Sequence, residues 1–296
     1  MDFSSLTPLA GGWSGRTFVA EVAGERAVVR VYPPGQGTPL APEVDAAVLR
    51  LVRGLVPVPE VLEVRRADEA ADAPGLLVTA WVTGVRGDLL LPDLDDAAAG
   101  RVGAQLGEVA ADLAGMPQPR PGPFLDADLT IGSFGDDGLP EFVAAHEAGF
   151  SHWDEAERAG LAEVAAAAQD LLDTVGRCSL VHSDLNPKNV LVDPERLVVT
   201  GVVDWEFAHA GHPFTDLGNL LRFERPPGRA AYAGAVLRAW AARRRTDPDE
   251  ALALARAADL WALVDLAARA PDNPVARRAH DRLRQIARTR DPGASS

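Results

Sequence analysis

The segment from Val181 to Asp204 constrains the fold and the chemistry of this chain more than any other. It opens with β-forming residues, passes through a polar loop, resumes as a strand, turns within residues 193–196 and returns as an apolar strand that ends at Asp204. In an antiparallel return the start of one strand lies beside the end of the other, so Asn189 and Asp204 are expected at one end of a hairpin. Asp184 lies on the loop just before them. Carboxylate and amide oxygens are hard ligands, so these three side chains together predict a Mg²⁺ site.

The order of residues in this segment also indicates a reaction. His182 lies two positions before Asp184, Asn189 lies five positions after it, and Asp204 follows the apolar strand. This H-x-D-x₄-N … D pattern is typical of phosphoryl transfer in kinase-like enzymes, with Asp204-Trp205-Glu206 where protein kinases carry D-F-G. A D-x₄-N spacing alone would also fit a turn cap and a strand end, but the complete pattern is much more specific.

On these residues the chain resembles the aminoglycoside phosphotransferase family, a kinase-like group that includes antibiotic kinases, choline kinases and homoserine-type kinases. The run from Gly211 to Gly218 is similar to the family's G-x-P … D-L pattern, and the resemblance extends over most of the chain. It implies an enzyme that transfers phosphate from ATP, with GTP as the alternative, to an alcohol group with the help of Mg²⁺.

The resemblance also assigns roles to residues. It implies that Asp184 is the base or orienting group for a substrate hydroxyl, and that Asn189 and Asp204 hold Mg²⁺. It implies that Asp216 supports the catalytic loop through its backbone, and that His182 is structural.

The pattern of the whole chain predicts an α+β, bilobal fold, and the resemblance implies that this fold is protein-kinase-like. Short β-branched runs and one amphipathic helix predict a small β-rich N-terminal lobe for nucleotide binding, residues 1–79, and a hinge at 80–84. Alanine-rich helical stretches predict a large, mostly helical C-terminal lobe for catalysis and substrate binding, residues 85–290, before a disordered tail at 291–296. Long helices are expected at residues 94–113, 155–175, 229–243, 249–268 and 275–289.

Two features of the N-terminal lobe match a nucleotide site. The glycine-rich run from Gly11 to Thr17 precedes the first confident strand, where its backbone N–H groups and the Ser14 hydroxyl could contact phosphate. On the second strand, Arg30 stands where the family carries a lysine that touches the α- and β-phosphates; arginine keeps the charge and binds phosphate in a fork. Its helix partner is expected to be Asp45 rather than Glu43, because the family's spacing to the following apolar residues fits Asp45 better.

Three further nucleotide contacts are expected. By analogy with the family, the backbone of Ala80 and Val82 in the hinge would bind the purine edge. Lys188 is the only lysine of the chain and lies four residues past Asp184, where it could reach the γ-phosphate. A solvated loop lysine is the alternative.

The composition limits the partners. With 43 acidic and 29 basic residues the net charge is −14, and such a surface repels nucleic acid and anionic membranes. No apolar run approaches the ~20 residues of a membrane span, and the N-terminus lacks a basic region followed by an apolar one. Cys178 is the only cysteine, so no internal disulfide forms. These features predict a cytoplasmic protein with no evident protein partner.

The charge is unevenly distributed. Up to residue 82 there are 10 acidic and 7 basic residues, net −3, whereas the rest has 33 and 22, net −11. We therefore expect a cationic acceptor, either an aminoglycoside or a basic cyclic peptide of the viomycin or capreomycin kind, and a role in antibiotic resistance. The proposed acidic contacts are Glu206, Asp259 and Asp265, together with the loop residues Asp126, Asp128, Asp136 and Asp137.

Other functions remain open at this point. A choline- or homoserine-like metabolite kinase would also take an amine, and a macrolide kinase would need a more apolar pocket. A nucleotide-binding pseudokinase would explain the arginine at position 30, but Asp184, Asn189 and Asp204 are intact. A metal-dependent hydrolase with His182 and Asp184 as ligands is the weakest alternative, because no further histidine cluster supports it.

Overall fold

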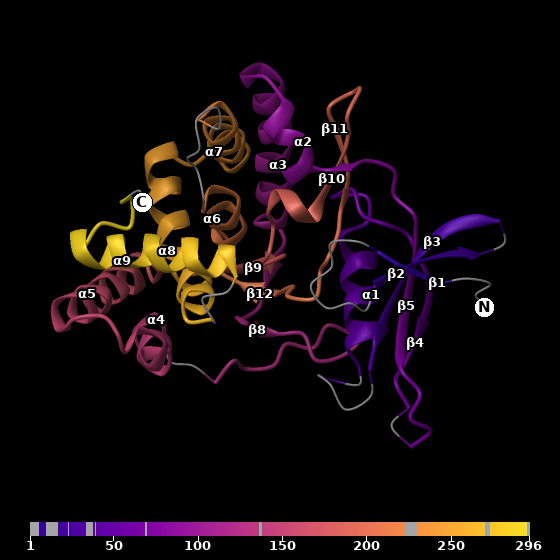
Figure 1. Ribbon diagram of the computed structural model, residues 1–296, viewed down its shortest axis with the longest axis horizontal. Coiled ribbons are helices and arrows are strands. Elements are labelled where there is room, and N and C mark those ends of the chain that lie inside the picture. The colour runs from indigo at the N-terminus through magenta and orange to yellow at the C-terminus, as the bar shows by residue number, and fades with distance from the viewer. Residues whose placement is uncertain are drawn as a thin grey trace. The chain divides into compact units, whose positions relative to one another are not determined.

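The chain forms two compact units, each assembled from segments that are distant in sequence. The computed structural model describes residues 6–9, 17–22, 24–33, 38, 40–68, 70–135, 138–222, 230–269 and 273–294. Unit 1 comprises Met1–Asp93, Gly122–Gly132 and Asn186–His209, and unit 2 comprises Leu94–Pro121, Ser133–Leu185 and Ala210–Ser296. The end of the N-terminal lobe at residue 79 and the end of the hinge at residue 84 stay predictions. Figure 1 shows the elements along the chain by colour.

Unit 1 is built on an antiparallel sheet with the strand order β1-β2-β3-β5-β4. The strands are β1 (Leu6–Pro8), β2 (Thr17–Val22), β3 (Glu25–Tyr32), β4 (Val61–Arg65) and β5 (Gly75–Ala80). β2 pairs with β3, and β4 pairs with β5, each in the antiparallel sense. β3 lies between β2 and β5, so its side chains occupy the middle of the sheet.

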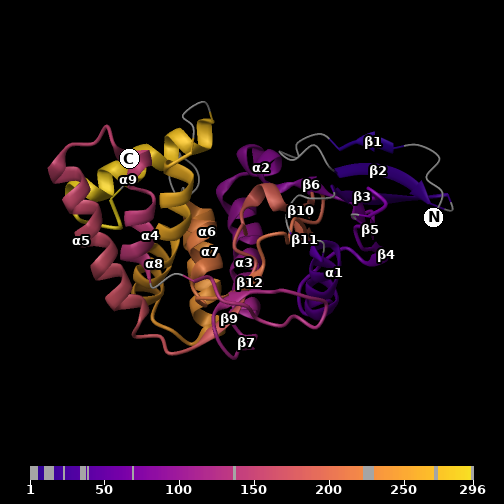
Figure 2. The same ribbon diagram turned by 90° about the horizontal axis from the view of Figure 1, so that it is seen from below.

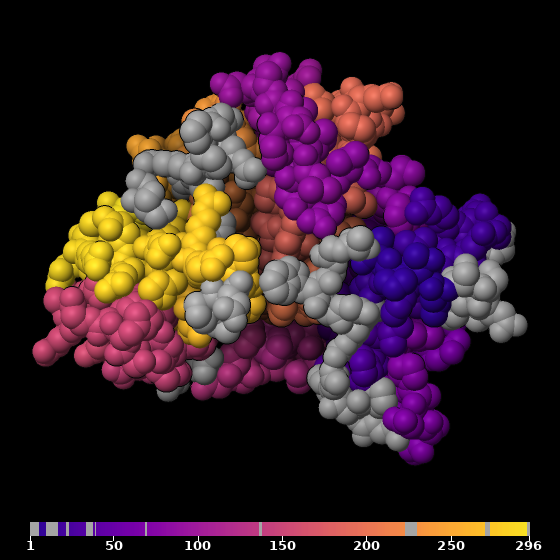
Figure 3. Space-filling model, in the orientation of Figure 1, coloured from indigo at the N-terminus to yellow at the C-terminus, as the bar shows by residue number. Residues whose placement is uncertain are grey.

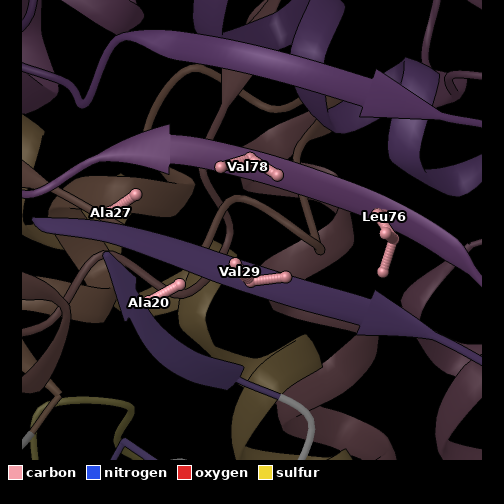
Figure 4. Close-up of a cluster of buried hydrophobic side chains, with 5 residues drawn as sticks. All are labelled: Ala20, Ala27, Val29, Leu76 and Val78. Atoms are coloured by element: carbon pink, nitrogen blue, oxygen red, sulfur yellow. The ribbon is translucent and has the colours of Figure 1, made fainter. Parts of the chain in front are cut away.

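The two faces of β3 differ in character. Ala27 and Val29 point to one face, where they form an apolar cluster with neighbouring residues of β2 and β5. Figure 4 shows this cluster, which consists of Ala20, Ala27, Val29, Leu76 and Val78. Since successive side chains of a strand alternate, Arg30 and Tyr32 point to the opposite face. Helix α1 (Ala41–Val52) packs against β4 and β5 (Figure 2).

A second sheet of unit 1 contains the segment that the sequence singles out. Strands β10 (Val190–Asp193) and β11 (Val198–Val202) form the predicted hairpin, and β6 (Val85–Arg86) pairs with the free edge of β10. The 3₁₀ helix η3 (Pro187–Asn189) leads into β10. Unit 1 also contains the short elements α2 (Gly87–Leu90), η1 (Leu91–Asp93) and β8 (Gly122–Pro123).

Unit 2 is mostly helical, as predicted. Its helices are α3 (Asp96–Leu113), α4 (Leu139–Ala145), η2 (Glu147–Phe150), α5 (Glu155–Leu172), α6 (Thr215–Leu221), α7 (Ala230–Arg244), α8 (Pro248–Ala267) and α9 (Pro274–Thr289). The short strands are β7 (Pro117–Gln118), β9 (Cys178–Val181) and β12 (His209–Gly211), which starts at the last residue of unit 1. Aspartates at the N-caps of α3, α5 and α8 accept hydrogen bonds from first-turn N–H groups, which fixes where these helices begin.

Close helix packing holds unit 2 together. A Cβ added at Gly107 of α3 would lie 2.3 Å from the carbonyl oxygen of Val236 in α7, so only glycine permits this approach. At the surface, α9 lies beside α5 (Figure 3), where Arg284 and Arg288 pair with the buried Glu157. Among the described residues, no helix is both long and apolar enough to cross a membrane.

Candidate active site

The hairpin of unit 1 places Asn189 and Asp204 at the same end. Val190 pairs with Val202, and the N–H of Val203 donates to the carbonyl oxygen of Asn189 across 2.9 Å. The backbone of Asp204 has a φ of +66°, in the left-handed region that few residues other than glycine adopt. Such strain at a polar residue is often found at functional sites. The role of Asn189 and Asp204 as metal ligands stays a prediction.

A loop of unit 2 carries Asp184 and is fixed by a buried carboxylate. The two oxygens of Asp216 accept hydrogen bonds from the backbone N–H groups of His182 and Ser183, each across 2.9 Å. The N–H of Asp184 donates to Nδ1 of His182 across 3.3 Å, and Ser183 has a φ of +67°. Asp216 and His182 thus determine the backbone conformation next to Asp184. The catalytic role of Asp184 and the supporting roles of the other two stay predictions.

Arg30 forms the charged centre of unit 1. Its Nη1 donates to Oδ1 of Asp204 across 2.8 Å, and its Nη2 donates to Oε2 of Glu206. Burial acts to lower the pKa of the Arg30 guanidinium, but Tyr32, Glu206 and Asp204 together raise this pKa above its ordinary value. A permanent positive charge therefore lies beside the proposed metal ligand Asp204.

The predicted ion pair between Arg30 and Asp45 is wrong. Asp45 accepts a hydrogen bond of 2.5 Å from the hydroxyl of Tyr32, which lies on the same face of β3 as Arg30. The other candidate on α1, Glu43, pairs with Arg66 at the surface across 2.9 Å. Neither α1 carboxylate is therefore the partner of Arg30, because Asp204 and Glu206 occupy its two terminal nitrogens.

The hinge residues present different backbone groups. The N–H of Ala80 donates to the carbonyl of Glu60 across 2.8 Å. The N–H of Trp81 donates to the carbonyl of Arg26 across 3.2 Å, and the Arg26 guanidinium lies 3.8 Å from the centroid of the Trp81 ring. Within the described part of the chain, no hydrogen bond uses the N–H of Val82. Purine binding by Ala80 and Val82 stays a prediction.

Two further nucleotide contacts have different outcomes. Lys188 lies in η3, whose first turn is capped by the side chain of Asn186 through a 3.1 Å hydrogen bond to the N–H of Lys188. Its contact with a γ-phosphate stays a prediction. Ser14 and the rest of the predicted phosphate loop up to residue 16 lie outside the described residues.

The proposed acidic substrate contacts are largely engaged by arginines. The buried carboxylate of Asp259 is paired with Arg222 across 2.8 Å, and its contact with the acceptor stays a prediction. Asp265 pairs with Arg269 across 2.5 Å on α8, and Glu206 pairs with Arg30. Asp126 accepts hydrogen bonds from the N–H groups of Asp128 and Thr130 within its own loop. Asp136 and Asp137 lie outside the described residues.

The sequence interpretation missed two residues. Tyr32 was detectable, because it lies two positions from Arg30 and must share its strand face. Arg222 gave no sequence signal, since its distance of 37 residues from Asp259 matches no local spacing.

The side chains of the candidate site can be compared with the ligands that a metal ion requires. Among the described residues, no group of three or more His, Cys, Asp or Glu side chains could by itself enclose a metal ion. Mg²⁺ usually takes one or two carboxylates and keeps water or phosphate as its other ligands. The oxygen donors of Asn189 and Asp204 at one end of a hairpin fit that preference.

A strand-rich unit with a cation on its central strand, and a helical unit with a supported His-x-Asp loop, are the two parts of a kinase-like phosphotransferase. The chain belongs to the phosphotransferase enzyme family, whose model, APH, matches residues 5–254. It is a phosphotransferase enzyme, and the resemblance stated from the sequence is confirmed.

Solved structures show the same protein-kinase-like aminoglycoside phosphotransferase fold. One is a thermostable mutant of aminoglycoside phosphotransferase APH(4)-Ia in a ternary complex with ADP and hygromycin B, with a TM-score of 0.64 and 24% identity, covering 100% of this chain and 96% of that one. Another is the GDP complex of wild-type aminoglycoside 2'-phosphotransferase-IIIa, with a TM-score of 0.67 and 19% identity, covering 98% and 94%. At these identities the likeness shows the fold alone.

Curated relatives are much longer proteins. Acyl-CoA dehydrogenase family member 10 of Mus musculus is 25% identical over 220 residues, or 70% of this chain. Acyl-CoA dehydrogenase family member 11 of Rattus norvegicus is 25% identical over 232 residues, or 74% of this chain. The chain spans only 19% and 28% of the lengths of these two relatives.

Proposed function

We propose that this protein transfers the γ-phosphate of ATP, with GTP as the alternative donor, to a hydroxyl group of a small molecule. The observation that carries the proposal is the contact of Arg30 with Asp204 in unit 1, at the end of the hairpin where Asn189 also lies. These side chains offer one permanent cation and two oxygen ligands, which is what a metal-bound polyphosphate requires. In unit 2, the loop after β9 supplies Asp184 as the group that orients or deprotonates the acceptor hydroxyl.

Each residue has a distinct task in this proposal. Asn189 and Asp204 would hold Mg²⁺, which when bound neutralises phosphate charge. Arg30 binds phosphate oxygens, and Lys188 and Ser14 add contacts to the phosphates. The carbonyl of Ala80 and the N–H of Val82 bind the purine edge. His182 and Asp216 keep the Asp184 loop in place.

The proposed acceptor is a cationic antibiotic, either an aminoglycoside or a basic cyclic peptide of the viomycin or capreomycin kind, and the proposed role is antibiotic resistance in the cytoplasm. Its support is the net charge of −11 beyond residue 82 and the fold shared with an enzyme solved with hygromycin B. We propose no nucleic acid, membrane or protein partner.

A small metabolite is the second candidate acceptor. It is favoured by the curated relatives, which carry the names of acyl-CoA dehydrogenase family members. It is also favoured by the arginines that pair with Asp259, Asp265 and Glu206, because these pairs reduce the negative charge available to a polycation.

A salt titration of an ADP-release assay tests the acceptor class. The panel contains an aminoglycoside, a basic cyclic peptide, a macrolide, and choline and homoserine. For a polycation, the acceptor KM should rise several-fold between low and high salt while kcat and the nucleotide KM change much less, because the Debye length is only ~8 Å at 0.15 M. Preferred turnover of the macrolide or homoserine with a salt-independent KM would contradict a cationic acceptor.

A further inference from the structure

The phosphate-binding cation of unit 1 is paired with the segment after β11 and not with helix α1. The two terminal nitrogens of Arg30 contact different carboxylates, Asp204 and Glu206. These two residues are separated only by Trp205, whose indole N–H donates to the carbonyl of Val202 across 3.0 Å. The indole contact ties the segment to the end of β11 and so keeps both carboxylates next to Arg30.

Arginine is chemically suited to this arrangement. Its guanidinium presents donors in a planar fork and can contact two acceptors at once, whereas a lysine ammonium acts as a point charge. Asp204 is also the residue proposed to bind Mg²⁺. Two cations would compete for the same carboxylate oxygen, so a metal held by Asp204 would weaken the contact of Arg30 with that oxygen. Glu206 then remains as the carboxylate that holds Arg30.

The α1 carboxylate that the family resemblance implies as the partner is used elsewhere. Burial raises the pKa of Asp45 to about 6, so this carboxylate is ionised at neutral pH and accepts the hydrogen bond from Tyr32. Burial and the charge of Asp45 also raise the pKa of the Tyr32 hydroxyl above its ordinary value, so Tyr32 is a neutral donor. The Tyr32–Asp45 pair therefore connects β3 to α1 without involving the charge of Arg30.

We propose that Glu206 is the positioning residue for Arg30: it keeps one nitrogen of the guanidinium in place while the other leaves Asp204 and binds a phosphate oxygen of the nucleotide. The inference rests on the proposed nucleotide site. It gives Glu206 the task that the family resemblance implies for a carboxylate on α1. It also removes Glu206 from the acidic contacts proposed for the acceptor.

Calorimetric titration with ADP tests this role without any acceptor. The proteins are the wild type, Glu206→Gln, Glu206→Asp, Arg30→Ala and the double variant Arg30→Ala/Glu206→Gln, each titrated with Mg²⁺ and with EDTA. Glu206→Gln should raise the Kd for ADP about tenfold with Mg²⁺, as expected for a lost charge-assisted hydrogen bond, and less in EDTA, where Asp204 still contacts Arg30. In the Arg30→Ala background, which removes the cation, the same substitution should raise it less than about threefold, because coupled residues are not additive. Glu206→Asp should recover part of the affinity.

Two control variants isolate the effect. Glu63→Gln removes a carboxylate that pairs with Arg65 on β4 and should leave the Kd unchanged. Asp45→Asn should raise the Kd less than Glu206→Gln does, and the Tm of every variant reports folding. An effect of Glu206→Gln that persists undiminished in the Arg30→Ala background would show that Glu206 does not act through Arg30 and would overturn the proposal. A larger effect of Asp45→Asn would also overturn it. A wild type that binds neither ADP nor GDP would contradict the proposed function itself.

Discussion

Two arginine–carboxylate clusters in this molecule have similar chemistry and different surroundings. In unit 1, the side chains of Arg30, Asp204 and Glu206 are 18%, 37% and 35% exposed. In unit 2, those of Arg222 and Asp259 are 8% and 4% exposed, and the cluster also includes Asn219. Arg222 contacts both oxygens of Asp259 and is enclosed, whereas each carboxylate of the first cluster can still meet solvent.

The difference separates a structural cluster from a functional one. A buried charge cannot exchange its partner without a large desolvation cost, so the Arg222 cluster keeps one arrangement. A half-exposed charge can exchange its partner for water, a metal ion or phosphate at a much lower cost. Substitutions in the two clusters should therefore affect different properties, stability in unit 2 and nucleotide binding in unit 1.

The largest effects are expected on turnover. Asp204→Ala, in the exposed cluster, should abolish transfer and weaken binding of Mg²⁺-nucleotide. Asp184→Ala should lower kcat by ~10²–10⁴-fold while ADP still binds, because it removes only the orientation of the hydroxyl. ADP release and ADP calorimetry measure the two properties. Turnover near that of the wild type in Asp184→Ala would refute its assignment.

Stability should respond most strongly to the enclosed cluster. Asp259→Ala leaves Arg222 buried without its carboxylate and should lower the free energy of unfolding by about 3–5 kcal/mol. Asp265→Ala is the matched control on the same helix, since its pair with Arg269 is exposed and should contribute less than about 0.5 kcal/mol. Urea denaturation measures both values. Equal losses in the two variants would show that burial does not distinguish the clusters.

Substitution of Arg30 should change nucleotide binding strongly and stability only slightly, the opposite of the expectation for Asp259. Arg30→Ala should raise the nucleotide KM about tenfold or more, because a charge-assisted contact with phosphate is lost. Arg30→Lys keeps the charge and should retain substantial activity. The free energy of unfolding should change by about 1 kcal/mol or less, since water can solvate Asp204 and Glu206. A normal nucleotide KM in Arg30→Ala would move the phosphate-binding role to another cation such as Lys188.

The smallest expected effect is on the pH dependence of stability. It concerns the cluster in which the buried Glu157 pairs with the partly exposed Arg284 and Arg288. The hydrogen bond from Arg284 lowers the pKa of the buried Glu157 from 4.5 to about 2. Because the folded-state pKa is the lower one, this group stabilises the fold above about pH 4.5 and loses that contribution as the pH falls towards 2. The difference in urea midpoint between the wild type and Glu157→Gln should therefore shrink between pH 5 and pH 2. A difference that stays constant with pH would contradict the assigned pKa.

The sequence predicted the fold and part of the site for physical reasons. The alternation and turn residues of the Val190–Val202 hairpin fix its register, and register alone brings Asn189 and Asp204 to one end. Alanine richness over long stretches likewise identified α3, α5, α7, α8 and α9, but the short helices α4 and α6 were missed because seven residues give too little signal.

The ion pairs could not be predicted in the same way. Whether Arg30 contacts Asp45 or Glu206 depends on side-chain direction and on competition from Tyr32, and neither leaves a spacing in the sequence. The pairing of Asp259 with Arg222 depends on how α8 packs against α6, which brings residues distant in sequence together. For this reason, some acidic residues that the sequence predicts as free negative charge are neutralised by arginines in the structure.

The exchange of lysine for arginine on β3 also changes how the protein reacts with covalent reagents. A guanidinium that stays protonated is a poor nucleophile, so Arg30 would not be acylated by amine-reactive nucleotide analogues that modify a lysine at this position. Lys188 carries the only side-chain amine of the chain. Acylation of a lysine side chain could therefore occur only at Lys188. Mass spectrometry would detect it at this one position in η3, just before β10.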